Sequence, residues 1–344
     1  MKKKTTLQDI SQVLGISVTA VSKALRGHKS ISAETKRLVL ETAKKLDYKG
    51  QPINALEEKT YKGKVYIIVD QRVQADPYTI SACFTMDTVL KSHGLEVILS
   101  GIQISEPYDR TVAKIRDDNP AAIVLFGRFS EKMAEEFRGN GTPIITLDND
   151  YPYFPVDSVL PNDYYGTFLA VRHFVQAGHT KIGFIGDNRM SSTFRTRYHG
   201  FCDALEHWGL ENRPEYIYDA RLVDSFGEIQ FNAFLDKLDY DRLPTAFFCA
   251  NDPIAIVLNN HLNARGIRTP DAVSIIGFDN IEACEWQSPP LTSVNYPREH
   301  VALRAVELLL WRLDNKEAPC NKILIQPKLT VRQSVAPPKK ISGK

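Results

Sequence analysis

Hydrophobic residues recur at helical spacing in three places within the first 48 residues of the chain. The apolar face of the first predicted helix is formed by Leu7, Ile10, Val13 and Leu14. The faces of the second and third are formed by Val21, Ala24 and Leu25 and by Leu38, Val39, Ala43 and Leu46. Thr6, Ser17 and Ser32 precede the three patterns as predicted N-caps, and Gly15 separates the first two helices. Two helices joined by a tight glycine turn and backed by a third predict an all-α helix-turn-helix unit at residues 1–48.

From residue 64 onward the pattern changes to short β-branched runs that alternate with helical stretches. The predicted strands are residues 65–69, 96–100, 121–126, 143–147, 181–185, 216–218, 246–249, 273–276 and 323–325. Near-continuous apolar strands separated by helices are typical of parallel sheets covered on both faces. The rhythm occurs twice, so we expect an α/β body of two lobes, each with a doubly wound parallel sheet. Ligands bind at the carboxyl ends of such strands, so the expected ligand site lies between the lobes.

The predicted domain boundaries follow from these changes of pattern. The helical unit occupies residues 1–48, a polar and irregular linker residues 49–63, the two-lobed body residues 64–338, and a tail residues 339–344. The last predicted helix and strand are expected to return to the first lobe. We therefore assign residues 64–160 and 292–325 to the first lobe, and residues 161–291 and 326–338 to the second.

Composition places the chain among ordinary soluble globular proteins. It has 344 residues, of which 43% are hydrophobic and 24% charged, which fits two or three domains. The lysines at residues 2–4 are not followed by an apolar stretch, so no secretory signal is predicted. No run approaches the roughly 20 apolar residues that cross a bilayer. The five cysteines include no Cys-x-x-Cys pair, which favours reduced thiols in a cytoplasmic protein and no zinc site.

Charge indicates what the helical unit binds. Residues 1–64 hold 14 Lys and Arg against 6 Asp and Glu, a net charge of +8, whereas the whole chain is +2 and the remainder therefore −6. A basic unit on an acidic body is typical of a nucleic-acid-binding domain. The outer face of the second helix carries Val18, Thr19, Ser22 and Lys23. Apolar groups there can contact thymine methyls and Lys23 can reach guanine, although a solvated helix face without a partner is the alternative.

Three motifs in the helical unit resemble the LacI/GalR family of transcription regulators. They are T-L-x-D-I-x-x-x-L-G-I-S over residues 6–17, A-V-S-K-x-L over residues 20–25, and I-S-x-x-T-x-x-x-V over residues 31–39. The resemblance implies that Val18, Thr19 and Lys23 read operator DNA. It implies phosphate contacts for Thr6, Ser17, Ser22, His28 and Lys29. The family usually has Arg where this chain has Lys23. Lysine cannot donate two parallel hydrogen bonds to one base as arginine does, so a weaker preference for guanine is expected at this position.

The linker resembles the family's hinge only in part. Relatives have a Pro-Asn-x-x-Ala-x-x-Leu hinge that becomes helical on DNA and inserts a leucine into the minor groove. Here Gly50 replaces the proline, Pro52 comes late, and Leu56 is the candidate for the inserted leucine. A flexible tether without groove contact is the alternative.

The body also resembles the family, whose effector-binding half is similar to periplasmic sugar-binding proteins. The motifs are G-H-x-x-I-x-F-I-G at residues 178–186, R-x-R-x-x-G-F at 195–201, A-N-D at 250–252, G-F-D-N at 277–280 and P-P-L-T-S-V at 289–294. The effector contacts that this resemblance implies are Arg197, Asn251 and Asp279 on the second lobe, with Asp148, Asp76 and Tyr78 on the first. A carboxylate, an amide and a guanidinium suit a polar ligand. Aromatic residues for a sugar or base face are Tyr78, Trp286 and Tyr296. A structural ion pair is the alternative for Arg197 and Asp279, and core packing for the aromatics.

Other classes of protein are less well supported by the residues. The chain lacks the Gly-x-Gly-x-x-Gly, Gly-x-x-x-x-Gly-Lys-Ser/Thr and Gly-x-Ser-x-Gly patterns of dinucleotide sites, phosphate loops and nucleophile elbows. His173 and His179 have no paired carboxylate at metal-ligand spacing. No catalytic residue, cofactor or metal is therefore predicted. A sugar-binding protein that only delivers its ligand would not need the helix-turn-helix unit at residues 5–48. A regulator whose pocket no longer binds a ligand is an alternative that the sequence does not exclude.

Together these observations predict a cytoplasmic, ligand-responsive repressor of transcription that is not an enzyme. A two-fold homodimer would place one helix-turn-helix unit on each half of a pseudo-palindromic operator. The expected effector is a sugar or sugar derivative, with a nucleobase or nucleoside as the alternative. No membrane partner is expected.

Overall fold

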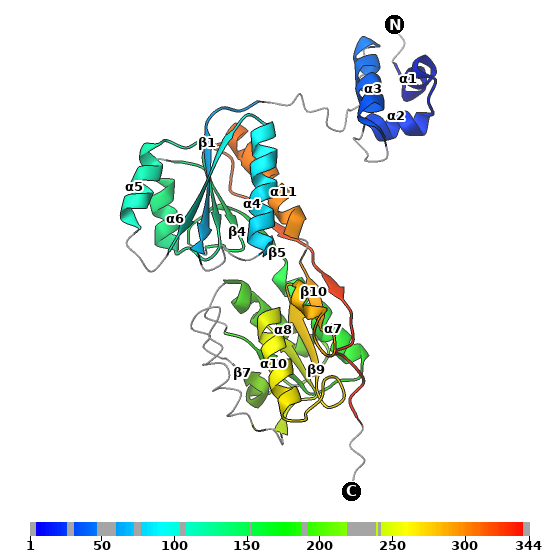
Figure 1. Ribbon diagram of the computed structural model, residues 1–344, viewed down its shortest axis with the longest axis vertical. Coiled ribbons are helices and arrows are strands. Elements are labelled where there is room, and N and C mark those ends of the chain that lie inside the picture. The colour runs from blue at the N-terminus through cyan, green and yellow to red at the C-terminus, as the bar shows by residue number, and fades with distance from the viewer. Residues whose placement is uncertain are drawn as a thin grey trace. The chain divides into compact units, whose positions relative to one another are not determined.

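The computed structural model describes residues 5–25, 31–46, 60–71, 77–103, 108–139, 141–151, 153–187, 192–218, 239, 242–296 and 298–339 (Figure 1). The chain divides into two compact units, Met1–Tyr61 and Lys62–Lys344. Asp76, His28, Lys29, Leu56 and most of the predicted linker lie outside the described residues.

The first unit consists of α1 (Leu7–Leu14), α2 (Val18–Leu25) and α3 (Ala33–Lys45). Thr6 caps α1 as predicted: its hydroxyl accepts a hydrogen bond from the Asp9 amide, and the Asp9 carboxylate accepts one from the Thr6 amide, 2.7 Å away. Gly15 has a φ of 65°, a left-handed conformation that glycine adopts without strain. The shared core is formed by Ile10, Val21, Ala24, Val39 and Ala43.

Two residues predicted to lie on buried helix faces are exposed instead. Val13 is 61% exposed and Leu38 42% exposed. Three short helices cover only a narrow stripe of one another, so residues at the margin of each apolar face stay in solvent.

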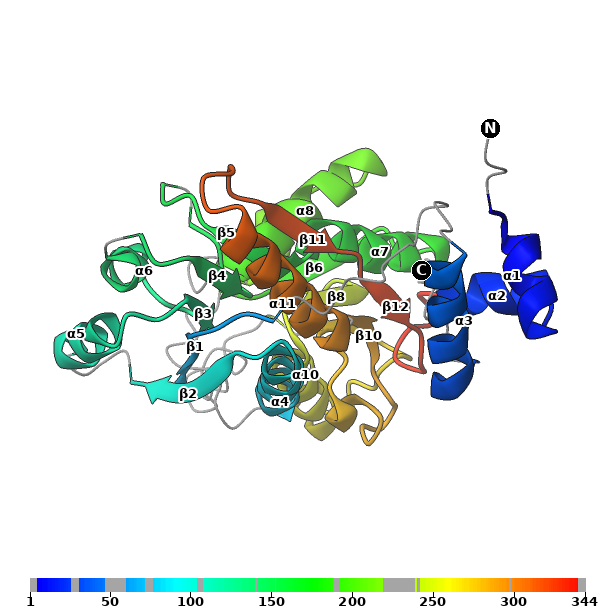
Figure 2. The same ribbon diagram turned by 90° about the horizontal axis from the view of Figure 1, so that it is seen from above.

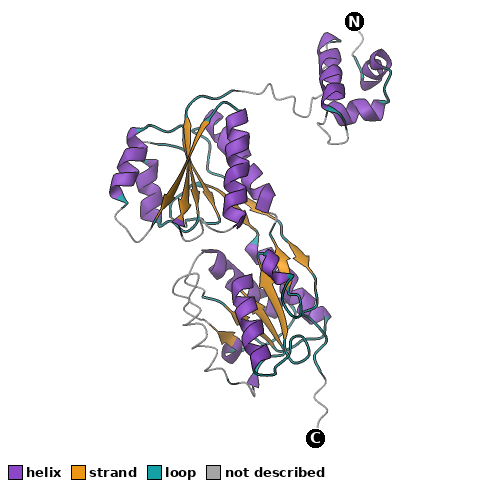
Figure 3. Cartoon of the chain, viewed as in Figure 1, coloured by secondary structure: helices purple, strands orange, loops and turns teal. Residues whose placement is uncertain are grey.

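The second unit contains two six-stranded sheets, each of which defines a lobe (Figure 3). The first sheet has the order β11-β5-β4-β3-β1-β2 and is parallel throughout. Its strands are β1 (Lys64–Asp70), β2 (Glu96–Ile102), β3 (Ala122–Phe126), β4 (Ile144–Leu147), β5 (Asp157–Pro161) and β11 (Lys322–Ile325). The second sheet has the order β12-β10-β9-β8-β6-β7, and only β12 is antiparallel to its neighbour. Its strands are β6 (Ile182–Ile185), β7 (Ile217–Tyr218), β8 (Ala246–Cys249), β9 (Ser274–Phe278), β10 (Thr292–Asn295) and β12 (Lys328–Thr330).

Helices pack against the strands of both lobes. The first lobe has α4 (Pro77–Ser92), α5 (Asp109–Asp117), α6 (Glu131–Arg138) and α11 (Arg298–Asp314). The second has α7 (Asp163–Gln176), α8 (Ser192–His207) and α10 (Asp252–Ala264), with the short 3₁₀ helices η2 (Pro214–Tyr216) and η4 (Glu282–Cys284). Figures 1 and 2 agree that α4 and α11 lie side by side. Each lobe has its own apolar core, and that of the second is rich in phenylalanine.

The chain crosses between the lobes three times. It passes from β5 to α7, from β10 to α11, and from β11 to β12. The predicted return of α11 and β11 to the first lobe is confirmed. The assignment of residues 292–295 to the first lobe is wrong, because these residues form β10 of the second sheet. This strand is short and carries polar Thr292, Ser293 and Asn295, so it lacks the β-branched run by which the other strands were predicted.

Two further features of the described residues bear on class. No described helix has the length and apolar character needed to span a membrane. The five cysteines are all free thiols.

Candidate functional site

The outer face of α2 is the first candidate site, and its residues lie in the first turns of the helix. Val18 is 40% exposed and Thr19 is exposed, whereas Ser22 and Lys23 are half-buried. The Ser17 hydroxyl accepts a hydrogen bond from the Ala20 amide, 3.1 Å away, so it caps α2. The apolar side of α2 faces the three-helix core, which fixes the direction in which the outer side chains project.

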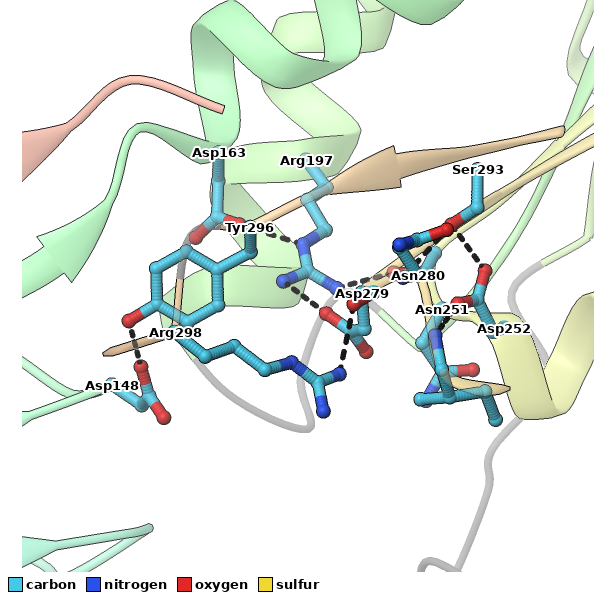
Figure 4. Close-up of polar contacts among 12 residues, drawn as sticks. Asp148, Asp163, Arg197, Asn251, Asp252, Asp279, Asn280, Ser293, Tyr296 and Arg298 are labelled. Carbon is cyan, nitrogen blue, oxygen red and sulfur yellow. Dashed lines mark hydrogen bonds and ion pairs between the residues drawn. The ribbon is translucent and has the colours of Figure 1, made fainter. Parts of the chain in front are cut away.

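The second candidate site is a group of polar side chains that follow strands of both sheets (Figure 4). Asp148 follows β4 of the first sheet, while Asn251 follows β8 and Asp279 follows β9 of the second. Asp148, Asp279 and Asn280 have φ values of 60°, 103° and 51°. Non-glycine residues with positive φ are strained and cluster at functional sites.

Arg197 is the centre of this group. Its side chain lies on α8 and is only 5% exposed. Nε donates to Asp163 Oδ1 at 2.7 Å, Nη1 to the Ala250 carbonyl at 2.6 Å, and Nη2 to Asp279 Oδ1 at 3.2 Å. The guanidinium also lies 3.7 Å from the centre of the Phe278 ring, which makes a cation–π contact. Arg197 and Asp279 therefore form an ion pair with each other, and their contact with an effector stays a prediction.

Asp163 is a partner of Arg197 that the sequence did not reveal. It is 4% exposed at the first position of α7. Burial raises the pKa of its carboxyl to about 6, and the Arg197 guanidinium limits this rise. Burial lowers the pKa of Arg197, but Asp163 and Asp279 together outweigh that effect and raise it.

A hydrogen bond joins the two lobes at this site. Tyr296, which follows β10 and is 4% exposed, donates its hydroxyl to Asp148 Oδ1 at 2.9 Å. Burial raises the pKa of the Asp148 carboxyl to about 7. A second bond between the lobes runs from the Ser192 hydroxyl to Asn149 Oδ1 at 3.1 Å. The two lobes therefore touch through polar pairs at this site.

Asn251 and Asp252 support the strand ends from within the second lobe. Asn251 Oδ1 accepts a hydrogen bond from the Ile254 amide at 3.0 Å and caps α10. Asp252 is fully buried, and it accepts from the Ser293 hydroxyl at 2.6 Å and from the Ile281 amide at 2.9 Å. A Cβ at Gly277 would lie 2.1 Å from the Asp252 carboxylate, so this position in β9 requires glycine. Burial raises the pKa of Asp252 to about 7.

The three aromatic candidates differ in how far they are buried. Tyr296 is buried and joins the site through its hydroxyl, so the core-packing alternative holds for its ring. Trp286 is 72% exposed after η4, so core packing is wrong for it. Tyr78 belongs to the first turn of α4, and its side chain lies outside the described residues.

Sequence reasoning missed three residues of the group. Asp163, Arg298 and Ser192 follow strands or begin helices, which is where a parallel α/β fold gathers its site. Arg298 begins α11, and its Nη2 donates to the Asp279 carbonyl at 2.8 Å. Polar residues at helix starts were the signal that could have identified them.

Comparisons with known proteins match both units. The model of bacterial regulatory proteins of the lacI family matches residues 6–51, and that of a periplasmic binding protein-like domain matches residues 171–335. The HTH-type transcriptional repressor PurR of Pasteurella multocida is 27% identical over 347 residues, which is 96% of this chain and 98% of the relative. The repressor of the same name from Mannheimia succiniciproducens is 28% identical over 337 residues, with the same coverage.

Solved structures share the fold over 80% to 97% of the chain. The complex of the transcriptional regulator CelR with cellobiose has a TM-score of 0.70 and 21% identity, covering 96% of this chain and 100% of that one. The lac repressor dimer bound to operator and the anti-inducer ONPF has a TM-score of 0.67 and 19% identity, covering 97% and 100%. A LacI family regulator from Enterococcus faecium with bound ribose has a TM-score of 0.66 and 23% identity, covering 80% and 100%.

Proposed function

The chain joins a lacI-type DNA-binding domain to a periplasmic-binding-protein-like body and so belongs to the LacI family of bacterial regulatory proteins, and from this premise we propose that it is a repressor whose hold on operator DNA is set by a small molecule. Its relatives are transcription regulators and not enzymes. The observation that carries the proposal is the outer face of α2, which a capped three-helix core presents to solvent within a basic stretch, residues 1–64, of net charge +8.

In this proposal α2 reads base edges in the major groove. Val18 and the Thr19 methyl contact thymine methyl groups, and Lys23 donates to guanine. Thr6 and Ser17 cap helix starts, where side chains and amides meet phosphate, and Ser22 in the middle of α2 is proposed as a further phosphate contact. His28 and Lys29 are proposed as phosphate contacts, and Leu56 as a residue that enters the minor groove.

The effector is proposed to bind at the ends of the strands, where side chains from both lobes meet. Asp148, Asn251 and Asp279 offer hydrogen-bonding groups, with Arg197 behind them. The cellobiose-bound and ribose-bound structural neighbours support a sugar or sugar derivative as the ligand. Ligand contacts to Asp148 and Tyr296 would change the bond between the lobes, and so bias the conformation that binds operator.

The proposed assembly is a homodimer formed through the first lobe. A groove of about 270 Å³ lies between α4 and edge strand β2, and its lining is almost entirely apolar. Ile80, Phe84 and Leu99 in this lining are 58%, 73% and 59% exposed. Contiguous exposed apolar side chains mark interaction surfaces. A two-fold dimer pairs the same surface of two copies, so this face of one chain would pack against the same face of the other. The neighbouring lac repressor structure, which is a dimer, supports this assembly.

One experiment tests the central proposal. The full chain is used to select binding sequences from randomised duplex DNA, and fluorescence anisotropy then measures affinity for the selected site with and without sugars, nucleobases and nucleosides. We expect a pseudo-palindromic site and at least one compound that changes its affinity by tenfold or so, which is about 1.4 kcal/mol of coupling. Binding without sequence preference would contradict the DNA-reading proposal.

A further inference from the structure

We infer that the effector carries no negative charge and meets the strand-end site mainly with hydroxyl or amine donors. This inference rests on the proposed function, because it concerns the same ligand site. It narrows the ligand class to uncharged or cationic molecules and removes phosphorylated sugars and nucleotides from it.

The Arg197 guanidinium at the site is already engaged by the protein. Arg197 uses all three of its nitrogens, on Asp163, the Ala250 carbonyl and Asp279. Arg298 donates to the Asp279 carbonyl at 2.8 Å. A phosphate or carboxylate on the ligand would have to displace Asp163 or Asp279 from Arg197. Each displaced carboxylate would then lose its counter-charge, and Asp163 is only 4% exposed.

The groups that stay open at the site are mostly acceptors. Asp148 and Asp279 each use Oδ1 in the bonds above, and their Oδ2 atoms have no donor among the described residues. Asn280 Oδ1 is buried and likewise has no hydrogen-bond partner in the described part of the chain. Asp279 is 26% exposed at its side chain, so a ligand can reach it. Three open acceptor oxygens require donors, which hydroxyl and amine groups supply and phosphate groups do not.

Acidic residues also outnumber basic ones along this edge. Among the described residues, Asp70 ends β1, Asp148 and Asp279 directly follow β4 and β9, Asp163 and Asp252 begin α7 and α10, and Asp187 lies two residues after β6. The arginines are Arg128, Arg197 and Arg298. Juxtaposed like charges in a partly desolvated site are strongly unfavourable.

The test uses matched ligand pairs with the full-length protein. Thermal unfolding and calorimetric titration compare ribose with ribose 5-phosphate, glucose and glucosamine with glucose 6-phosphate, and adenosine with adenosine 5′-monophosphate. We expect that any pair that binds does so through its uncharged or amine-bearing member, with the phosphorylated member weaker by at least about tenfold. The inference is overturned if the phosphorylated compound of a pair binds as tightly as the unphosphorylated one. If that phosphorylated compound also changes operator binding, the proposed function is still supported.

Sulfate provides a probe that does not depend on the identity of the effector. At constant ionic strength, we expect no saturable binding of millimolar sulfate to the wild-type protein, whereas Asp279→Asn removes the negative charge beside Nη2 of Arg197 and creates such binding. Glu206→Gln, on an exposed part of α8, makes the same carboxylate-to-amide change and should leave sulfate binding absent. Saturable sulfate binding to the wild type that Arg197→Lys removes would overturn the inference even if no pair binds. If operator binding responds to no compound while sulfate behaves as expected, the proposed function is contradicted. The inference about the charge of the ligand is not.

Discussion

Tyr296 of the second lobe donates a hydrogen bond to Asp148 of the first lobe across 2.9 Å. The tyrosine ring is buried, so its hydroxyl is held in place, while the aspartate sits on strained backbone with a φ of 60°. A buried, strained polar pair between two lobes favours one arrangement of those lobes, and anything that removes the proton or the acceptor favours another.

Removing the Tyr296 hydroxyl should loosen this arrangement. Tyr296→Phe keeps the buried ring but leaves Asp148 Oδ1 without its donor, which should lower the free energy of unfolding by about 1 kcal/mol. Urea unfolding of the full chain measures the change. Tyr153→Phe, at a tyrosine that is 88% exposed on the first lobe, is the matched control and should be neutral. Equal effects of the two substitutions would mean that the bond contributes nothing.

Asp148 should also make stability depend on pH. Burial raises the pKa of its carboxyl to about 7, whereas the unfolded chain has a value of about 3.9. The folded state therefore holds the proton more tightly, and the stabilisation from this group is complete below about pH 4 and lost as pH rises through about 7.

Asp148→Asn removes this titration. We expect the free energy of unfolding of the variant, relative to the wild type, to rise between about pH 5 and about pH 8. Chemical denaturation across this range checks the slope. A constant difference between Asp148→Asn and the wild type would contradict the raised pKa of this carboxyl in the folded protein.

Loss of Arg197 should destabilise the second lobe in addition to any effect on the ligand. Arg197→Ala leaves Asp163 buried without its counter-charge, which typically costs about 3–5 kcal/mol. The cost should be much smaller in an Asp163→Asn background, because the unpaired charge is then absent. A double-mutant cycle by urea unfolding measures the coupling, and additive effects would contradict the pair as the cause. Asp279→Asn is therefore the cleaner substitution for testing effector response.

Lys23 should read one position of the operator. Lys23→Ala is expected to relax sequence preference there and to reduce affinity for the preferred base by about 1–3 kcal/mol, with other positions unaffected. Competition binding against operators changed one base pair at a time measures this. Lys45→Ala, an exposed lysine at the end of α3, controls for the loss of charge in the same unit. Uniform weakening on every sequence would assign Lys23 to phosphate.

The apolar face of α4 should hold the dimer together. Phe84 is 73% exposed in the free chain, and Phe84→Lys would bury a charge in the proposed interface. We expect the variant to sediment as a monomer and to lose affinity for the full palindrome, which is read by two units. Tyr153→Lys adds the same charge at an exposed aromatic and should leave the dimer intact. A dimeric Phe84→Lys protein would place the interface elsewhere.

Much of the fold was readable because its signals are local. The caps at Thr6, Ser17 and Ser32 are present, since a cap needs only a side chain and the next turn of the helix. Most strands were found because they are continuous apolar runs buried between helices. The exceptions are β5, which begins with two polar residues and ends in proline, and the short strands β10 and β12, which carry polar residues and pair with each other across more than 30 residues of chain.

The candidate site could be predicted only in part, because its contacts join residues that are far apart in the sequence. Asp279 and Arg197 were expected as ligand contacts, but the sequence does not show that Arg197 is bonded to Asp163, 34 residues earlier. Whether a guanidinium is open to a ligand or used by the protein depends on tertiary packing, which no spacing along the chain reports. Exposure of Trp286 and burial of Tyr296 were undetermined from sequence for the same reason.

The three crossings between the lobes have a consequence for dissecting the molecule. Neither lobe is a continuous stretch of chain: the first contains β1 to β5 and, after a long excursion, β11, whereas the second contains β6 to β10 and β12. A protease that nicks the chain at one crossing leaves two covalent tethers in place, so the halves stay associated. Isolating either lobe therefore calls for circular permutation with new connections at the crossings, and no simple truncation yields it.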